Sequence, residues 1–211
     1  MKLFTWSIAP NPRRVEIFLR EKEIEIPTED VGVPGKAFLN SKFLEKHPHR
    51  RVPLLQLDDG SYIAEAMAIC RYFELQFPEP SLMGIEPQEA ATIDMWERLA
   101  EGEGMQSISE FYRNSKNWFA DRSIAGHTKS FEQIPGLIKR GTARLSLFYD
   151  KFNAQLDNNE FVAGSYFSVA DITTLCTVDF ASFSKLGIPK HCKNLKRWYD
   201  AVSQRSSVSI R

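Results

Sequence analysis

Residues 52–73 combine residue types that could bind a small acidic ligand through the protein backbone. Pro53 stands at the start of an apolar run, where its missing N–H costs least and the neighbouring backbone is left free to bond another molecule. Glu65 and Ala66 precede the apolar residues of a predicted helix, so the first N–H groups of that helix have no partner inside it. Such N–H groups bind carboxylates. The spacing therefore predicts a carboxylate site beside the strand that begins at Pro53.

A hairpin and a helix are expected to position these residues. Residues 54–57 are mainly apolar, and the turn at 58–60 separates them from a strand-like pair at 62–63. Asp-Gly between two strands is a strong hairpin signal, because Gly60 can adopt the positive φ that the turn needs. The predicted helix has apolar residues at helical spacing: Ala66, Ile69, Cys70 and Phe73.

The order Val-Pro, hairpin with Asp-Asp-Gly, and Ile-x-Glu-Ala-x-Ala-Ile-x-x-Tyr-Phe-Glu resembles the glutathione-binding half of cytosolic glutathione transferases. The resemblance implies that Pro53 is cis and that the backbone of Val52 pairs with the cysteinyl part of glutathione. It also implies that Glu65 and Ala66 hold the γ-glutamyl end. This chain has Ala66 where the family usually has Ser, so a hydroxyl is lost while the backbone N–H remains.

Two basic residues are candidates for the glycine carboxylate of glutathione. Arg51 is the first choice because it adjoins Val52, and Lys42 is the second. The alternative is a solvated basic cluster that contains His47, His49 and Arg50.

The loop before the first predicted helix is where most subfamilies place a Tyr, Ser or Cys that hydrogen-bonds the glutathione sulfur. Here Ser7 and Asn11 are its polar candidates, although Ser7 could be a turn residue and Asn11 a helix cap. The sequence Ala-Pro-Asn-Pro-Arg-Arg-Val is similar to an atypical fungal and bacterial subgroup, in which helix N-terminal N–H groups and a bound water take this role. We therefore expect Asn11 and the N–H groups of this turn to activate the thiol.

The N-terminal half has the element order of a thioredoxin-like domain. We expect a strand at 2–6, a helix with Asn11 as its N-cap, and a parallel strand at 24–31. A weak helix around 38–44 and the hairpin–helix stretch complete a four-stranded mixed sheet. The predicted domain spans residues 1–77, followed by a Pro- and Gly-rich linker at 78–86.

The C-terminal half, residues 87–211, reads as an all-helical bundle, which makes the whole chain α+β. Helices are predicted over 88–119, 134–156 and around 195–202. Ser168 and Asp171 have the spacing of a capping box. Glutathione transferases carry the same Phe-Val-Ala-Gly-x-x-x-Ser-x-Ala-Asp-Ile segment at the start of a buried helix, which implies a folding role for this pair.

The first long helix of this half carries the expected electrophile pocket. Its candidates are Met105, Tyr112 and Ser115. The alternative is that Met and aromatic residues at helical spacing belong to the core.

Composition limits the partners. The 27 basic and 27 acidic residues balance, which argues against nucleic acid or an anionic membrane. The apolar runs fall short of the roughly 20 residues of a membrane span, and the N-terminus lacks a signal-peptide core, so we expect a cytoplasmic protein. The three cysteines fit neither a disulfide framework nor a redox pair, and the four scattered histidines predict no metal site.

The resemblance implies a homodimeric transferase that joins glutathione, as co-substrate, to small hydrophobic electrophiles by transfer of alkyl or aryl groups. Two alternatives stay open. One is a transferase-like fold with weak catalysis that serves as a binding or interaction module, and Ala66 together with the Tyr-, Ser- and Cys-poor loop motivates it. The other is a glutathione-dependent peroxidase or lyase built on the same site.

Overall fold

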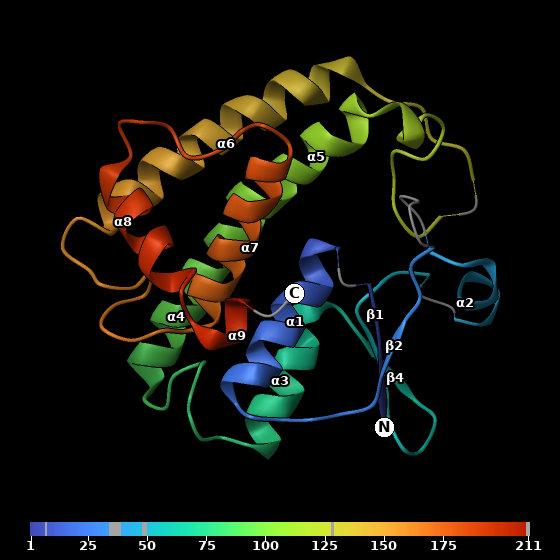
Figure 1. The fold of residues 1–211 in the computed structure, drawn as a ribbon, viewed down its shortest axis with the longest axis horizontal. Helices are drawn as coiled ribbons and strands as arrows, with labels where there is room; N and C mark the ends of the chain where they lie inside the picture. The colour runs from blue at the N-terminus through green and yellow to red at the C-terminus, as the bar shows by residue number, and fades with distance from the viewer. Residues whose placement is uncertain (7, 34–38, 48–49, 128, 210–211) are drawn as a thin grey trace. The chain divides into compact units, whose positions relative to one another are not determined.

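A computed structural model describes residues 1–6, 8–33, 39–47, 50–127 and 129–209 (Figure 1). Contacts between residues divide the chain into two compact units. Unit 1 contains Met1–Pro80 together with Ile124–Phe131, and unit 2 contains Ser81–Ser123 and Glu132–Arg211. The short segment at 124–131 therefore belongs by its contacts to the first unit, although it lies within the second half of the sequence.

Unit 1 contains the predicted four-stranded mixed sheet, with strand order β2-β1-β3-β4. β1 (Lys2–Thr5) pairs in parallel with β2 (Thr28–Asp30) and antiparallel with β3 (Leu54–Gln56). β4 (Tyr62–Ala64) completes the hairpin with β3. The turn residue Gly60 has a φ of 85°, the positive value expected from the Asp-Gly sequence.

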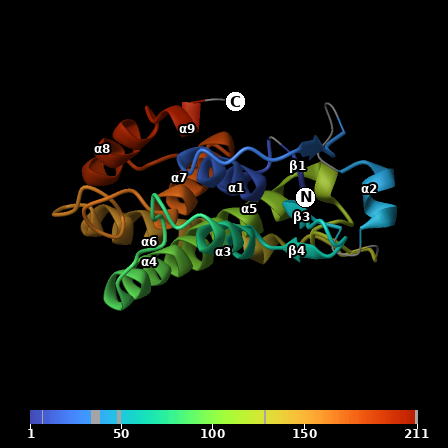
Figure 2. The same cartoon turned by 90° about the horizontal axis from the view of Figure 1, so that it is seen from below.

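Three helices flank this sheet: α1 (Pro10–Glu21), α2 (Ser41–Lys46) and α3 (Ala66–Gln76). Figure 2 shows α1 and α3 on one side of the strands and α2 on the other. α1 and α3 pack on each other and bury apolar residues, including Val15, Phe18, Ile69 and Phe73. The opposite face buries Phe4 in a cluster with Val31, Phe43 and Leu54.

The start of α1 differs from the prediction. The N-cap is Ala9 rather than Asn11, and Pro10 is the first helical residue. Proline suits this position because its φ is already helical and its missing N–H would be unpaired there in any case. The Asn11 side chain instead accepts a hydrogen bond from Arg14, 3.1 Å away.

Two other predicted elements are shorter in the structure. The second strand covers Thr28–Asp30 instead of 24–31, although its parallel pairing is confirmed. The weak helix begins at Ser41 because the Asn40 side chain caps it, accepting a hydrogen bond of 2.8 Å from the N–H of Phe43.

Unit 2 is helical, as predicted. Its elements are α4 (Pro87–Leu99), the π-helical segment η1 (Ala100–Met105), α5 (Gln106–Ser115), the 3₁₀ turn η2 (Asn117–Phe119), α6 (Pro135–Gln155), α7 (Val169–Phe183), α8 (Lys193–Val202) and α9 (Ser206–Ser209). α7 packs on α4, η1 and α5 and buries most of its side chains. Among the helices within the described ranges, none is both long enough and apolar enough to cross a membrane.

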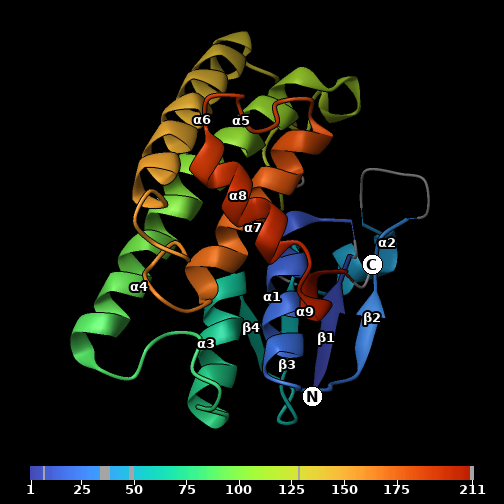
Figure 3. The same ribbon diagram turned by 60° about the vertical axis from the view of Figure 1, so that its left-hand side comes forward.

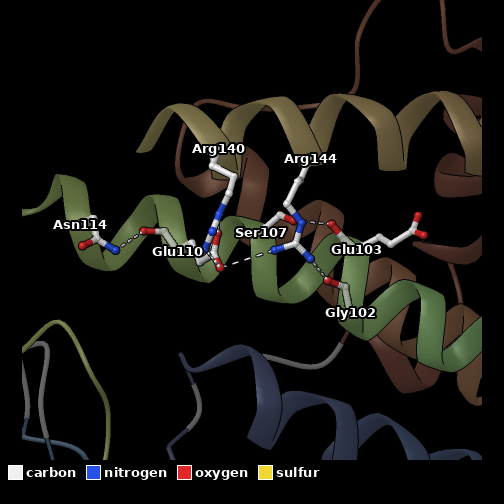
Figure 4. Close-up of polar contacts among 7 residues, drawn as sticks. All are labelled: Gly102, Glu103, Ser107, Glu110, Asn114, Arg140 and Arg144. Carbon is white, nitrogen blue, oxygen red and sulfur yellow. Dashed lines mark hydrogen bonds and ion pairs between the residues drawn. The ribbon is translucent and has the colours of Figure 1, made fainter. Parts of the chain in front are cut away.

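The predicted continuous helix over 88–119 is interrupted by η1 and ends at Ser115. In η1 the N–H of Gln106 donates to the carbonyl of Glu101, five residues back, and so bypasses the carbonyl of Gly102. Arg144 of α6 donates to the bypassed carbonyl through Nη2 (Figure 4). A side chain from a neighbouring helix thus satisfies an acceptor that the π segment releases.

Candidate functional site

The predicted ligand-binding backbone lies in unit 1, where the Val52–Pro53 peptide bond is cis. Pro53 is buried, and the strand ladder of β3 begins only at Leu54. Among the residues that the structure describes, none forms a backbone hydrogen bond with Val52. The N–H and C=O of Val52 are therefore able to pair with an extended ligand, as an added strand would.

Glu65 has a backbone conformation that the sequence did not indicate. Its φ is 70° and its ψ is 126°, in the left-handed half of the map, where a residue with a side chain is strained by about 1–3 kcal/mol. Its carbonyl accepts the first helical bond of α3 from Ile69, at 3.1 Å, and its side chain is exposed and does not cap the helix. The first N–H groups of α3 are thus left for another acceptor, and the strain is of the kind that ligand sites retain.

Ala66 is the first residue of α3 and is 4% exposed. Its methyl group lies in the protein interior while its N–H belongs to the uncapped first turn. The backbone donor expected at this position is present, and the hydroxyl of the usual Ser is absent from the sequence.

Arg51 is exposed and already has one partner. Its Nε and Nη2 donate to the carbonyl of Ala125 at 3.2 and 2.9 Å, which attaches the segment 124–131 to unit 1. Its Nη1 is left for a carboxylate. Lys42 is exposed on α2.

The alternative of a solvated basic cluster is wrong for His47. The centre of its ring lies 4.5 Å from that of Phe4 and 4.7 Å from that of Phe43, so the imidazole packs against these two aromatic side chains instead of standing in solvent. Arg50 donates to the carbonyl of Leu44 at 2.6 Å. His49 lies outside the described residues.

The loop before α1 offers few backbone donors. Pro10 and Pro12 have no N–H, so Asn11 holds the single backbone N–H among the first three residues of α1. Its Oδ1 accepts from Nη1 of Arg14, whose side chain is buried at 1% exposure, and this bond leaves Nδ2 as a second donor. Arg14 was not among the predicted site residues, and the other candidate, Ser7, lies outside the described residues.

In unit 2, Tyr112 is the centre of an aromatic patch. Ring centroids lie 5.0 Å away for Phe180, 5.5 Å for Phe119, 6.1 Å for Phe183 and 6.3 Å for Trp118. Phe183 is 72% exposed and Trp118 47%, so the patch presents flat apolar surface to solvent. Burial raises the pKa of Tyr112, which keeps its phenol protonated and able to donate a hydrogen bond.

The two other pocket candidates are engaged elsewhere. Met105 is 3% exposed in η1 and lies in the core, in agreement with the alternative interpretation. Ser115 donates through Oγ to the backbone carbonyl of Tyr112, 3.4 Å away.

The reciprocal bonds of a capping box join Ser168 and Asp171 at the start of α7. The Asp171 carboxylate also accepts from the backbone N–H of Val162 at 2.9 Å and from Nε1 of Trp198 at 2.8 Å. Burial raises the pKa of Asp171 to about 6 against the effect of these hydrogen bonds. Asp171 thus links the start of α7 to the loop at Val162 and to Trp198 of α8.

The two halves of the chain match the two domain models of one protein family. The model of the glutathione S-transferase N-terminal domain matches residues 8–76, and that of the C-terminal domain matches residues 132–206. Glutathione S-transferase 2 of Saccharomyces cerevisiae is 32% identical over 99% of this chain and 88% of its own length.

Solved structures of glutathione S-transferases superpose on nearly the whole chain. A glutathione S-transferase domain-containing protein from Marinobacter aquaeolei VT8 superposes with a TM-score of 0.87 and 34% identity, covering 99% of this chain and 100% of that one. Gtt2 of Saccharomyces cerevisiae superposes with a TM-score of 0.83 and 29% identity, covering 99% of each chain.

Proposed function

Since the chain belongs to the glutathione S-transferase family, we propose that it binds glutathione in unit 1 and transfers the glutathione thiolate to small hydrophobic electrophiles. The observation that carries the proposal is the backbone of Val52, whose N–H and C=O are left for a ligand next to the cis Pro53. In the same unit, helix α3 begins after Glu65, which has a strained backbone and does not cap the helix with its side chain. Both features leave polar groups available for a peptide-like ligand with a carboxylate.

The charges of glutathione match this arrangement. The cysteinyl backbone pairs with Val52, while the α-carboxylate of the γ-glutamyl residue accepts from the first N–H groups of α3. The exposed carboxylate of Glu65 faces the γ-glutamyl ammonium, and Arg51 or Lys42 takes the glycine carboxylate.

Thiol activation is assigned to Asn11. A thiol with a pKa of about 8.5 is about 3% ionised at pH 7, whereas a pKa of about 6.5 ionises roughly three quarters of it. Because only one N–H is available in the first three residues of α1, the Asn11 side chain supplies the second donor to the sulfur. Holding the two reactants together then contributes more than ionisation does.

The electrophile is assigned to the aromatic patch around Tyr112. Exposed rings favour a flat, apolar substrate, which stacks on Trp118 or Phe183. The protonated Tyr112 hydroxyl would donate to a polar group of the same substrate. We further propose, from the family resemblance, that the protein works as a homodimer in the cytoplasm.

A second candidate is a binding or interaction module with little catalysis, and Ala66 is the observation that favours it. A hydrogen bond to a charged group contributes about 1.5–3 kcal/mol, so the missing hydroxyl weakens the hold on the γ-glutamyl carboxylate. A glutathione-dependent peroxidase or lyase would use the same bound thiolate on a different co-substrate.

Calorimetry with glutathione, with the ultraviolet thiolate signal followed against pH, tests the proposal. We expect saturable binding and a thiol pKa well below that of free glutathione, followed by turnover in an electrophile screen. Binding without a lowered pKa would favour the module. Absence of binding would refute the transferase assignment.

A further inference from the structure

Three side chains with metal-ligand chemistry converge on one point of unit 2, and none of them is among the residues assigned above. Nε2 of His191 lies 2.8 Å from Oδ1 of Asp150, and Sγ of Cys192 lies 3.9 Å from the same oxygen. The three possible ligand atoms all lie within 4.8 Å of one another. An imidazole nitrogen, a thiol sulfur and a carboxylate oxygen are the three ligand types that zinc proteins use.

The backbone around this cluster is held in place by α6. Asn153, one turn after Asp150, accepts through Oδ1 from the N–H groups of Asn194 and Leu195, at 2.9 and 3.2 Å. Asn194 in turn donates to Asp157, 3.0 Å away. Residues 150 and 153 lie one turn apart on α6, and Asp157 follows just after its C-terminal end. Together they position the start of α8, which Figure 3 shows beside α6.

Cys192 is the N-cap of α8, so its position is set by the same bonds. Its N–H donates to the carbonyl of Pro189 at 3.0 Å, and its carbonyl accepts from Lys196 at 3.1 Å. The backbone of His191 and Cys192 is therefore held in place before a metal ion binds. This lowers the entropic cost of binding the ion.

The separations suit a tetrahedral ion. With ordinary zinc–ligand bond lengths, a nitrogen and an oxygen ligand lie about 3.4 Å apart, and a sulfur and an oxygen about 3.6 Å apart. The separations of 2.8 and 3.9 Å differ from these values by about 0.6 Å or less. The side chains of His191 and Asp150 are 67% and 55% exposed, so both are free to make this adjustment.

We propose that Asp150, His191 and Cys192 form a binding site for a tetrahedral divalent ion of the Zn²⁺ type, with water as its fourth ligand. A sulfur and an imidazole select Zn²⁺ over Mg²⁺ and Ca²⁺, which prefer oxygen ligands in larger number. The exposed Lys190 and Lys193 oppose a cation, but water screens charges at such positions. The bound ion would join α6 to α8 and stabilise unit 2.

A nucleophilic cysteine is the competing interpretation, and the surroundings of Cys192 disfavour it. Burial and the Asp150 carboxylate raise the pKa of the Cys192 thiol, whereas reactive cysteines have a lowered pKa and an accessible sulfur. Cys192 is 0% exposed.

The test uses the full chain without an affinity tag, stripped of metal and free of glutathione, because glutathione itself binds Zn²⁺. Calorimetry with Zn²⁺ measures stoichiometry and affinity, and Co²⁺ absorption reports a thiolate ligand through its near-ultraviolet charge-transfer band. The variants are His191→Asn, Asp150→Asn and Cys192→Ser. His127→Asn is the matched control, because His127 is also exposed and lies outside the cluster.

We expect one equivalent of Zn²⁺, a thiolate–Co²⁺ band and a melting temperature raised by about 5–10 °C when free Zn²⁺ is 100 times its Kd. His191→Asn, an exposed substitution that leaves folding intact, should weaken binding about 10-fold or more, and His127→Asn should not. Lack of stoichiometric binding, lack of the band, or equal affinity of wild type and His191→Asn would each overturn the proposal.

Discussion

The Nζ atom of Lys22 lies 2.8 Å from Oε2 of Glu74, and the Lys22 side chain is fully buried, with 0% exposure. The same ammonium donates to the carbonyls of Phe77 and Pro80, at 2.6 and 2.8 Å. The ammonium thus has two carbonyl acceptors and one carboxylate as its ion-pair partner, and its positive charge lies at the C-terminal end of α3, where the helix dipole favours it. This residue joins the ends of α1 and α3.

Replacement of Lys22 by Met should destabilise the protein by about 3–5 kcal/mol, because it removes the buried cation beside the nearly buried Glu74 carboxylate and the donor of two carbonyls. Urea denaturation measures the loss. Lys2→Met is the control, since the Lys2–Glu29 pair is about half exposed and should contribute less than about 1 kcal/mol. Equal losses for the two variants would contradict the assigned role of Lys22.

Gly141 should tolerate no side chain. A Cβ there would lie 2.6 Å from the carbonyl oxygen of Ser107 and 3.0 Å from the N atom of Phe111, both of which belong to the backbone of α5. Gly141→Ala should therefore separate α5 from α6 and cost about 1–3 kcal/mol in thermal or urea unfolding. Gly136→Ala in the same helix meets no atom within 4 Å and should be neutral or stabilising. A neutral Gly141→Ala would contradict the close approach of the two helices.

Asp171 should make folding less favourable as pH rises through the acidic range. Its pKa is raised from 3.8 to about 6 by burial, so the folded state holds the proton more tightly than the unfolded chain does. Its stabilising effect is complete below about pH 4 and is lost as pH rises to about 6. The unfolding free energy of wild type minus that of Asp171→Asn should fall over this range in urea titrations.

The matched control for Asp171 is Asp59→Asn. Hydrogen bonds from Ser61 lower the pKa of Asp59, so its small contribution should rise with pH instead. A difference for Asp171→Asn that increases with pH would show that its hydrogen bonds outweigh burial.

Restoring a hydroxyl at position 66 should strengthen glutathione binding. Ala66→Ser adds a donor at the uncapped start of α3, and about 1.5 kcal/mol for a charged acceptor corresponds to roughly 10-fold in Kd by calorimetry. Ala68→Ser, in the same helical turn but exposed, should leave Kd unchanged. If both variants bind like wild type, the γ-glutamyl carboxylate does not lie at this helix start.

Removal of the Asn11 side chain should raise the pKa of bound glutathione thiol and lower turnover about 10-fold at pH 7, because one of the two proposed donors is lost. The thiolate absorbance against pH and the turnover number measure the two effects. The exposed Asn158→Ala is the control. Unchanged pKa and turnover would move thiol activation to another group.

Features that depend on neighbours in the sequence could be predicted from the sequence. The positive φ of Gly60 follows from an Asp-Gly pair between two strands, and the bonds between Ser168 and Asp171 follow from a spacing of three residues. In each case the interacting residues lie within a few positions, so the local chain geometry alone brings them together.

Features that join distant positions needed the tertiary structure. Lys22 meets Phe77, Arg144 meets Gly102, and His191 meets Asp150 across separations of 55, 42 and 41 residues. Helical and strand periodicity predicts which face of an element is buried but not the register in which two elements pack. That register decides which polar side chains share a site, and it is why scattered histidines gave no metal spacing while the folded chain places one of them beside a cysteine and an aspartate.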